Sequence, residues 1–165
     1  RAALERLEAD GLVRISPQQG ILVREVSIRE VVEIFDLRLA LEAFVVERLA
    51  GRLAPAQLAL IEANLASAAA AVQAGDEVAY ARLDAAFHLL LCELHDNREI
   101  VAVMARNADR LARVIARMMR RDPARLAASH ADHAAIVAAI AQGASALAAQ
   151  RVRDHLQYGR LALIS

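Results

Sequence analysis

The fold is decided by a helical stretch near the middle of the chain, which reads DEVAYARLDAAFHLLLCELH (residues 76–95). Asp76 is a typical helix N-cap, and apolar residues follow it at a spacing of three or four. Asp84 and His88 stand four residues apart within this pattern, so both side chains leave the same face of one helix. The stretch therefore predicts a helix that carries two polar side chains on one face.

The composition favours helices in the rest of the chain as well. Hydrophobic residues make up 58% of the 165 residues, but aromatic residues make up only 3%, because alanine carries much of the apolar count. Only three prolines and six glycines interrupt the sequence, which is typical of an all-α fold. This length is enough for one domain with a substantial core and a small additional segment.

Charge and cysteine content exclude several classes of protein. The formal net charge is zero, so no overall basic field indicates a nucleic-acid or anionic-membrane partner. The single cysteine, Cys92, excludes an internal disulfide framework and is typical of a reducing cytosol. No apolar run reaches membrane-spanning length without charges and no signal peptide is visible, so we expect a cytoplasmic protein without a membrane partner. Arg1 lies within a helical pattern, and we expect further residues to precede it.

Residues 26–165 are expected to form an antiparallel six-helix bundle. Ser27 and Glu30 have the spacing of a capping box, and Asn97 is a further N-cap. Short connections containing glycine or proline separate the apolar runs, which favours antiparallel neighbours. The six expected helices cover approximately residues 27–50, 55–75, 76–95, 97–121, 122–143 and 144–161.

Residues 1–25 show a different pattern. Residues 1–10 are typical of the end of a helix, which the sequence Asp10-Gly11 terminates. Two short β-like runs, residues 12–15 and 21–23, follow on either side of a loop and predict a hairpin. A helix followed by a hairpin is the second half of a winged helix-turn-helix, so we expect a remnant of such a DNA-binding domain over residues 1–25.

His133 and His155 are the candidate partners of Asp84 and His88. At about 1.5 Å per residue, His133 and His155 lie roughly 15 and 18 Å from the turn at Gly143, so they are nearly level in an antiparallel pair. His88 likewise lies near the middle of its own helix. Three imidazoles and a carboxylate at one height suit a divalent ion, with zinc preferred and nickel, manganese or iron as alternatives. The spacing shows how far along its helix each residue lies but not toward which side its side chain points. Each residue could instead be a solvated group or a paired core residue.

Other polar residues in the helices have two interpretations each. Arg38 and Glu42 lie four residues apart, which alone indicates a surface ion pair worth a few tenths of a kcal/mol. Asn107 interrupts an apolar stripe, so it either points into a pocket or is a buried amide bonded to backbone. His130 lies three residues before His133 and is either a pocket residue or a surface residue.

Two groups of motifs resemble one family, the GntR transcription regulators. RAALERLEADGLV (residues 1–13) followed by PQQGILV (residues 17–23) resembles the recognition-helix end and the wing of their DNA-binding domain. DAAFH (residues 84–88), DHAAIVAAI (residues 132–140) and RDHL (residues 153–156) resemble the FCD effector domain of the FadR-type branch. Six effector-domain helices resemble the VanR-like subgroup of that branch. The usual Gly-Asp before the last helix is Gly143-Ala144 here, which weakens a cap but touches no expected ligand.

The resemblance implies roles for particular residues. The positions of Asp84, His88, His133 and His155 are the metal ligands in metal-binding members of the family. Arg38 matches an arginine that faces the effector pocket, and we add Asn107 as a second candidate there. The candidate DNA-contacting residues are Arg1 in the recognition helix and Gln19 and Gly20 at the wing tip.

We therefore expect a bacterial transcription regulator and not an enzyme. It would bind operator DNA as a homodimer, and its metal and Arg38 would hold a small carboxylate effector. The alternative is a helical-bundle metalloenzyme in which an open metal position activates water, with Glu42 or Glu93 as its base. A third possibility is a metal that only stabilises the bundle.

Overall fold

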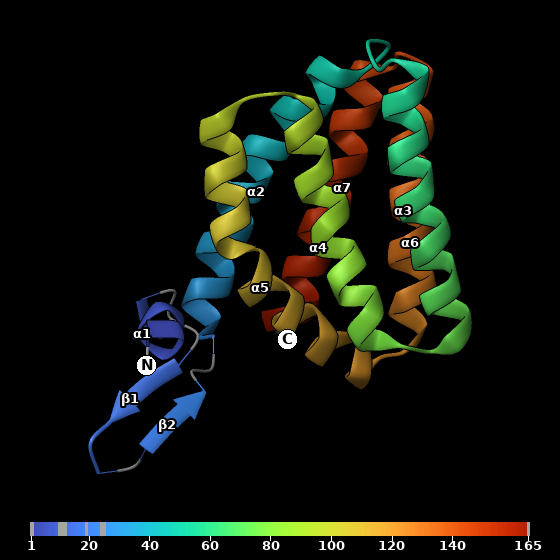
Figure 1. Ribbon diagram of the computed structural model, residues 1–165. Coiled ribbons are helices and arrows are strands. Elements are labelled where there is room, and N and C mark those ends of the chain that lie inside the picture. The colour runs from blue at the N-terminus through green and yellow to red at the C-terminus, as the bar shows by residue number, and fades with distance from the viewer. Residues whose placement is uncertain (1, 10–12, 19, 24–25, 165) are drawn as a thin grey trace.

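The computed structural model describes residues 2–9, 13–18, 20–23 and 26–164, and most of these residues are helical (Figure 1). Six helices follow a short helix and a two-stranded hairpin, so the fold predicted from the sequence is confirmed. The elements are α1 (Ala2–Ala9), β1 (Val13–Ser16), β2 (Gly20–Val23), α2 (Ile28–Leu49), α3 (Pro55–Ala74), α4 (Glu77–Leu94), α5 (Arg98–Arg121), α6 (Ala124–Ala141) and α7 (Ser145–Ile164).

The long helices form a bundle in which α4 occupies a central place. It packs against α3 on one side and α5 on the other, while α2 and α7 pack closely along each other (Figure 1). The sixth helix, α6, contacts both α3 and α7. The helix α1 and the antiparallel hairpin lie together at the end of the bundle where α2 begins (Figure 1). Side chains from α4, α6 and α7 can therefore meet inside the bundle.

Side-chain caps fix where the helices begin. Ser27 Oγ accepts a hydrogen bond from the Glu30 backbone N–H, and the Glu30 carboxylate accepts one from the Ser27 N–H, so the predicted capping box is present. Asp76 Oδ1 accepts from the backbone N–H groups of Val78 and Ala79 at 3.1 and 2.8 Å. Such caps stabilise a helix by about 1 kcal/mol each. The Asp76 cap sets the start of α4 and with it the height of the residues two turns further on.

Two glycines allow the α2–α3 turn to touch the α6–α7 turn. Gly51 and Gly143 have φ angles of +70° and +71°, which other residues rarely adopt. The Gly51 N–H donates to the Ile140 carbonyl at 2.9 Å, and a Cβ atom on Gly51 would lie 3.2 Å from the Gly143 Cα. This backbone contact holds the ends of α2 and α6 together.

The buried face of α2 includes charged residues, which the apolar pattern did not predict. Arg38 and Glu42 are both buried, whereas the neighbouring Leu37 is 37% exposed. At about 100° of rotation per residue, Leu37 lies roughly 100° around the helix from Arg38 and roughly 140° from Glu42, so it does not share their buried face. The largest apolar side chains of the core include Val45, Ile61, Tyr80, Phe87, Leu91, Met119, Ile136, Ile140 and Leu156.

Among the described residues, α3 is the helix that is long and apolar enough to cross a membrane by length and composition. Alanine is its most frequent residue, and 17% of the apolar window is buried in the bundle. Length and composition alone are weak grounds for a membrane segment. The helix packs against α4 and α6 as one wall of the bundle.

Candidate metal centre

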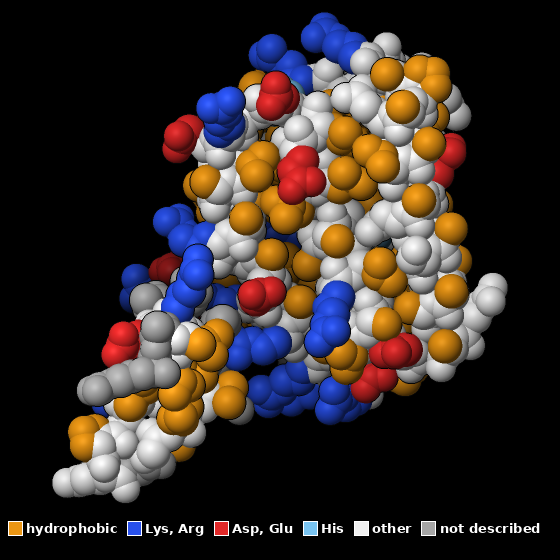
Figure 2. Space-filling view, in the orientation of Figure 1, with side chains coloured by type: hydrophobic (Ala, Val, Ile, Leu, Met, Phe, Trp, Pro, Cys, Tyr) orange, Lys and Arg blue, Asp and Glu red, His pale blue; other side chains and the backbone are white. Residues whose placement is uncertain are grey.

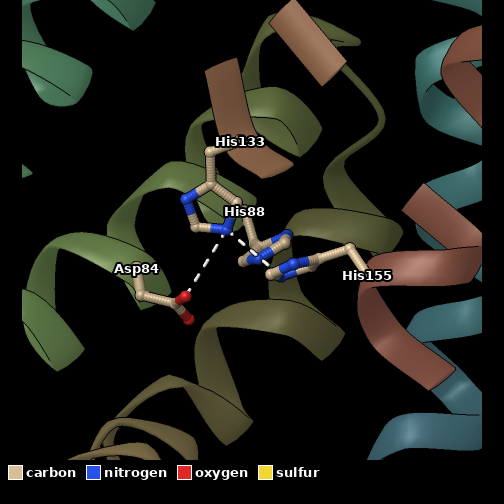
Figure 3. A group of neighbouring side chains, drawn as sticks. All are labelled: Asp84, His88, His133 and His155. Carbon is tan, nitrogen blue, oxygen red and sulfur yellow. Dashed lines mark hydrogen bonds and ion pairs between the residues drawn. The ribbon is translucent and has the colours of Figure 1, made fainter. Parts of the chain in front are cut away.

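Asp84, His88, His133 and His155 meet inside the bundle (Figure 3). One ligand atom from each residue lies within 4.8 Å of the ligand atoms of the other three. His133 Nε2 is 3.1 Å from His155 Nε2 and 3.4 Å from Asp84 Oδ1. The first three residues are buried and His155 is partly buried. The four side chains therefore lie at the same height along their helices and also point toward one another.

Two of the potential metal-ligand atoms in the cluster have no hydrogen-bond partner among the described residues. They are His88 Nε2 and Asp84 Oδ2, which are both buried. Leaving a buried polar atom unpaired costs about 1–3 kcal/mol, and more for a charged group. Nitrogen and carboxylate donors that converge in this way fit a divalent cation such as zinc. The residues present therefore fit a metal ion.

Burial keeps His88 and His133 in the neutral form that a metal requires. The pKa of His133 is well below its ordinary value because of burial, and the neighbouring His155 and His88 lower it further. The pKa of His88 is also lowered, first by burial and then by the charge of Arg38, although Glu42 acts in the opposite direction.

Partners on the outer side of the cluster orient its histidines. His88 Nδ1 lies 2.5 Å from Glu42 Oε2, so its N–H donates to the carboxylate and Nε2 is left with a lone pair facing the cluster. His155 Nδ1 lies 3.2 Å from Asp132 Oδ2 in the same kind of arrangement. The ring of Phe87 stacks on that of His133, with centroids 4.2 Å apart. Carboxylate–histidine pairs of this kind are typical of metal sites.

Glu42 is a residue of the site whose contact with His88 the sequence did not identify. Its other oxygen, Oε1, accepts from Arg38 Nε at 2.6 Å, so the pair expected at the surface is buried. Burial alone raises the pKa of Glu42, but Arg38 and His88 outweigh it and lower that pKa to about 2. The signals in the sequence were the spacing of four between Arg38 and Glu42, which surface pairs share, and the match of this pair to the family's Arg-x-x-x-Glu pattern.

A small cavity of about 20 Å³ lies beside the cluster. This is room for about one water molecule. An organic acid would therefore have to displace side chains on entering. The lining includes Phe35, Arg38, Asp84, Ile115, Met118, Met119, Arg125, Ser129, Asp132, His155, Tyr158 and Gly159.

The other candidate residues lie away from this cavity or outside the described part of the chain. Asn107 is half-buried and its amide donates to the Val103 carbonyl at 3.0 Å, outside the lining of the cavity. His130 is half-buried and also outside that lining. Gly20 begins β2, is exposed and has a φ of +76°. Arg1 and Gln19 lie outside the described residues.

Comparison with known proteins supports the fold and the family. Residues 33–158 match the FCD domain family. The chain is 36% identical over 89 residues to an HTH-type transcriptional regulator in the TAR-I ttuE-ttuC' intergenic region of Agrobacterium vitis, a match that covers 52% of each protein. It is 30% identical over 101 residues to the HTH-type transcriptional regulator YdhC of Bacillus subtilis (strain 168), covering 61% of the chain and 45% of the relative. The chain spans about half the length of these curated relatives.

Solved structures share the architecture over nearly the whole chain. E. coli McbR/YncC superposes with a TM-score of 0.84 at 21% identity, covering 99% of this chain and 82% of that one. A GntR transcriptional regulator from Rhodococcus sp. RHA1 also gives a TM-score of 0.84 at 21% identity, covering 98% and 77%. At this identity the likeness shows the fold. Because the family match covers most of the sequence, the chain belongs to the FCD domain family, as its motifs predicted.

Proposed function

We propose that this chain is the ligand-sensing part of a bacterial transcription regulator of the FadR-type, VanR-like group. In this proposal Asp84, His88, His133 and His155 hold a divalent metal ion, zinc in the first instance. The observation that carries it is the convergence of these four side chains beside a cavity that Arg38 also lines. A bound ion would supply positive charge and an open coordination position for a carboxylate.

The chain's own residues give the site its selectivity for an acid. Arg38 is held in place by Glu42 through Nε, while its NH2 group is buried without a hydrogen-bond partner among the described residues. A buried guanidinium with a free N–H favours a planar anion such as a carboxylate. Arg38 would therefore bind the acid, and Glu42 would position both Arg38 and His88.

The regulatory part of the proposal concerns DNA. Residues 1–25 would belong to a winged helix-turn-helix domain and residues 26–165 to the sensing domain, with Arg1, Gln19 and Gly20 contacting operator DNA. The α1–hairpin arrangement and the relatives named as HTH-type regulators support this assignment. A homodimer in the cytoplasm would read a pseudo-palindromic operator, and binding of the acid would change its affinity for that operator.

The experiment uses the full-length regulator loaded with zinc and its operator DNA. We expect a small organic acid to change the operator affinity, and Arg38→Gln to abolish this response while metal binding remains. Operator binding that ignores every candidate acid in the metal-loaded protein would contradict the proposal.

The metalloenzyme alternative has less support. Glu42 is engaged by both Arg38 and His88, and its pKa of about 2 makes it a poor base near neutral pH. Glu93 is exposed on α4 and does not line the cavity. The relatives reported above are named as transcription regulators. A metal that only stabilises the bundle would predict a large loss of thermal stability on chelation and no effect of any acid.

A further inference from the structure

Arg125, in the first turn of α6, is a buried cation without a carboxylate partner. Its residue is 8% exposed, and its Nε atom is buried with no hydrogen-bond partner among the described residues. Its guanidinium stacks on the ring of Tyr158, with Cζ 3.9 Å from the ring centroid. The ion pairs within the described part of the chain do not include Arg125. A buried charge without a counter-charge is costly, so this position favours an anion from outside the chain.

Arg125 lines the same cavity as Arg38, on a different helix. The charge of Arg38 is already balanced by Glu42, with 2.6 Å between Nε and Oε1. The two carboxylates in the lining contact histidines and not Arg125, since Asp84 Oδ1 lies 3.4 Å from His133 Nε2 and Asp132 Oδ2 lies 3.2 Å from His155 Nδ1. Among the described residues, Arg125 is therefore the cation of this cavity that no carboxylate contacts directly.

A groove on the outside of the bundle leads to the same residue. It has a volume of about 470 Å³ and lies among the start of α2, the second half of α5 and the end of α7. Met118 and Arg125 line both this groove and the inner cavity. Arginine side chains gather at this end of the bundle, Arg117 and Arg121 among those lining the groove (Figure 2). An anion approaching through the groove would meet Arg125 before it reached the histidine cluster.

We infer that Arg125 is a second anion-binding residue of the sensing site and that the ligand is a dicarboxylic acid. One carboxylate would lie toward Arg38 and the histidine cluster, and the other would pair with Arg125 across the cavity. This inference rests on the proposed function, because it assumes that the cavity beside the cluster is the acid-binding site. It adds the requirement that the ligand carries two negative charges.

The test compares two acids of equal chain length, succinate and butyrate, by calorimetric titration of the zinc-loaded chain. We expect succinate to bind at least roughly tenfold more tightly, because a charge-assisted hydrogen bond to a buried group is worth about 1.5–3 kcal/mol. Arg125→Gln should reduce this preference to about twofold or less while butyrate affinity stays nearly unchanged. Arg125→Lys should keep part of the preference, because it retains the charge but loses the planar fork.

The matched control is Arg48→Gln. Arg48 also stacks on an aromatic ring, with its Cζ 4.8 Å from the centroid of Phe44, but it is exposed and lines none of the cavities described above. The substitution Arg48→Gln should leave the affinities for succinate and for butyrate unchanged. As a check on folding, Arg125→Met should leave the melting temperature of the ligand-free chain unchanged or raise it, because an uncompensated charge is removed. A fall of several degrees would assign Arg125 a structural role and overturn the inference.

The outcomes separate the inference from the proposed function. If butyrate binds the zinc-loaded chain and succinate binds no better, the proposed function stands and the dicarboxylate inference is wrong. A succinate preference that survives in Arg125→Gln would also overturn it. If neither acid, nor malonate or glutarate, binds the zinc-loaded chain, the proposed function and the inference both fail.

Discussion

Arg38 and Arg125 are both buried beside the same cavity, yet their surroundings differ. Arg38 donates to Glu42, whose other oxygen contacts His88, so its charge is balanced and it helps to orient a candidate metal ligand. Arg125 stacks on Tyr158 and has no carboxylate partner among the described residues. The difference indicates that Arg38 both helps to hold the site together through Glu42 and has one N–H group free for a ligand, whereas Arg125 shares its guanidinium with no carboxylate of the described residues.

The roles assigned to Arg38 and Arg125 require that the histidine cluster holds a metal. The substitution His133→Ala tests this requirement and has the largest expected effect. His133 contributes Nε2, which lies 3.1 Å from His155 Nε2 and 3.4 Å from Asp84 Oδ1. Its removal should lower the affinity for zinc by well over the roughly 10–100-fold that loss of an outer-shell partner causes. Competitive titration with a chromophoric chelator measures the change. His130→Ala, one turn earlier on α6, is the control, and unchanged zinc uptake in His133→Ala would show that the ligand set is wrong.

Glu42→Gln would make the surroundings of Arg38 resemble those of Arg125. Removing one charge of a buried pair costs about 3–5 kcal/mol. The single amide oxygen of glutamine cannot accept from both Arg38 and His88, so zinc binding should weaken about 10–100-fold. Urea denaturation of the metal-free chain and zinc titration measure the two effects.

Glu33→Gln is the matched control for Glu42→Gln, because Glu33 pairs with Arg29 at 2.8 Å on the surface with side chains 58% and 88% exposed. Its effect should stay within about 0.5 kcal/mol. Equal changes in the free energy of unfolding for Glu42→Gln and Glu33→Gln would show that the buried Arg38–Glu42 pair does not hold the site together.

The stability of the metal-free chain should depend on pH because His88 and His133 are buried. The folded-state pKa values of His88 and His133 lie below their ordinary value near 6.5. As the pH falls below that value the unfolded chain binds protons that the folded chain does not, so stability decreases. We expect a loss of up to about 1.4 kcal/mol per pH unit for each histidine between pH 6.5 and 5.5. Glu42, with a pKa of about 2, would contribute only at lower pH, through its ordinary range near 4.5.

Urea titrations at pH 7.5, 6.5 and 5.5 in the presence of a chelator measure this dependence. A stability that stays constant over this range would mean that the histidines are already accessible to protons in the folded chain.

Asn107→Ala should have the smallest effect. The Asn107 amide donates to the Val103 carbonyl of its own helix, outside the cavity that the two arginines line. We expect a change in stability of about 1 kcal/mol or less and no change in acid affinity. A clear loss of succinate binding would assign Asn107 to the site after all, as its position in the sequence suggested.

Much of the fold could be predicted because its signals are local. Ser27, Asp76 and Asn97 cap helices as their residue types indicate, and Gly75 adopts the left-handed conformation at the end of α3. Helix rise also predicted that His133 and His155 would lie at one height. These inferences depend only on residues close together in the sequence or on a single turn.

The faces and partners within the site depend on how helices rotate against each other, and sequence spacing does not show this. Arg38 and Glu42 have the spacing of a surface pair, but the contact of Glu42 with His88, 46 residues away, places the pair in the core. Arg125 follows a helix start at Asp122-Pro123 and has no distinctive motif around it. Its role emerges only from its burial and from its stacking on Tyr158, a residue of another helix.

The most direct test of the central claim is to titrate succinate into the zinc-loaded chain and into the same chain after chelation. If the four-residue cluster holds a metal that cooperates with Arg38, succinate should bind the zinc-loaded chain at least roughly a hundredfold more tightly than the chelated chain. Equal affinity in both forms, or binding only after chelation, would contradict a metal-dependent sensing site.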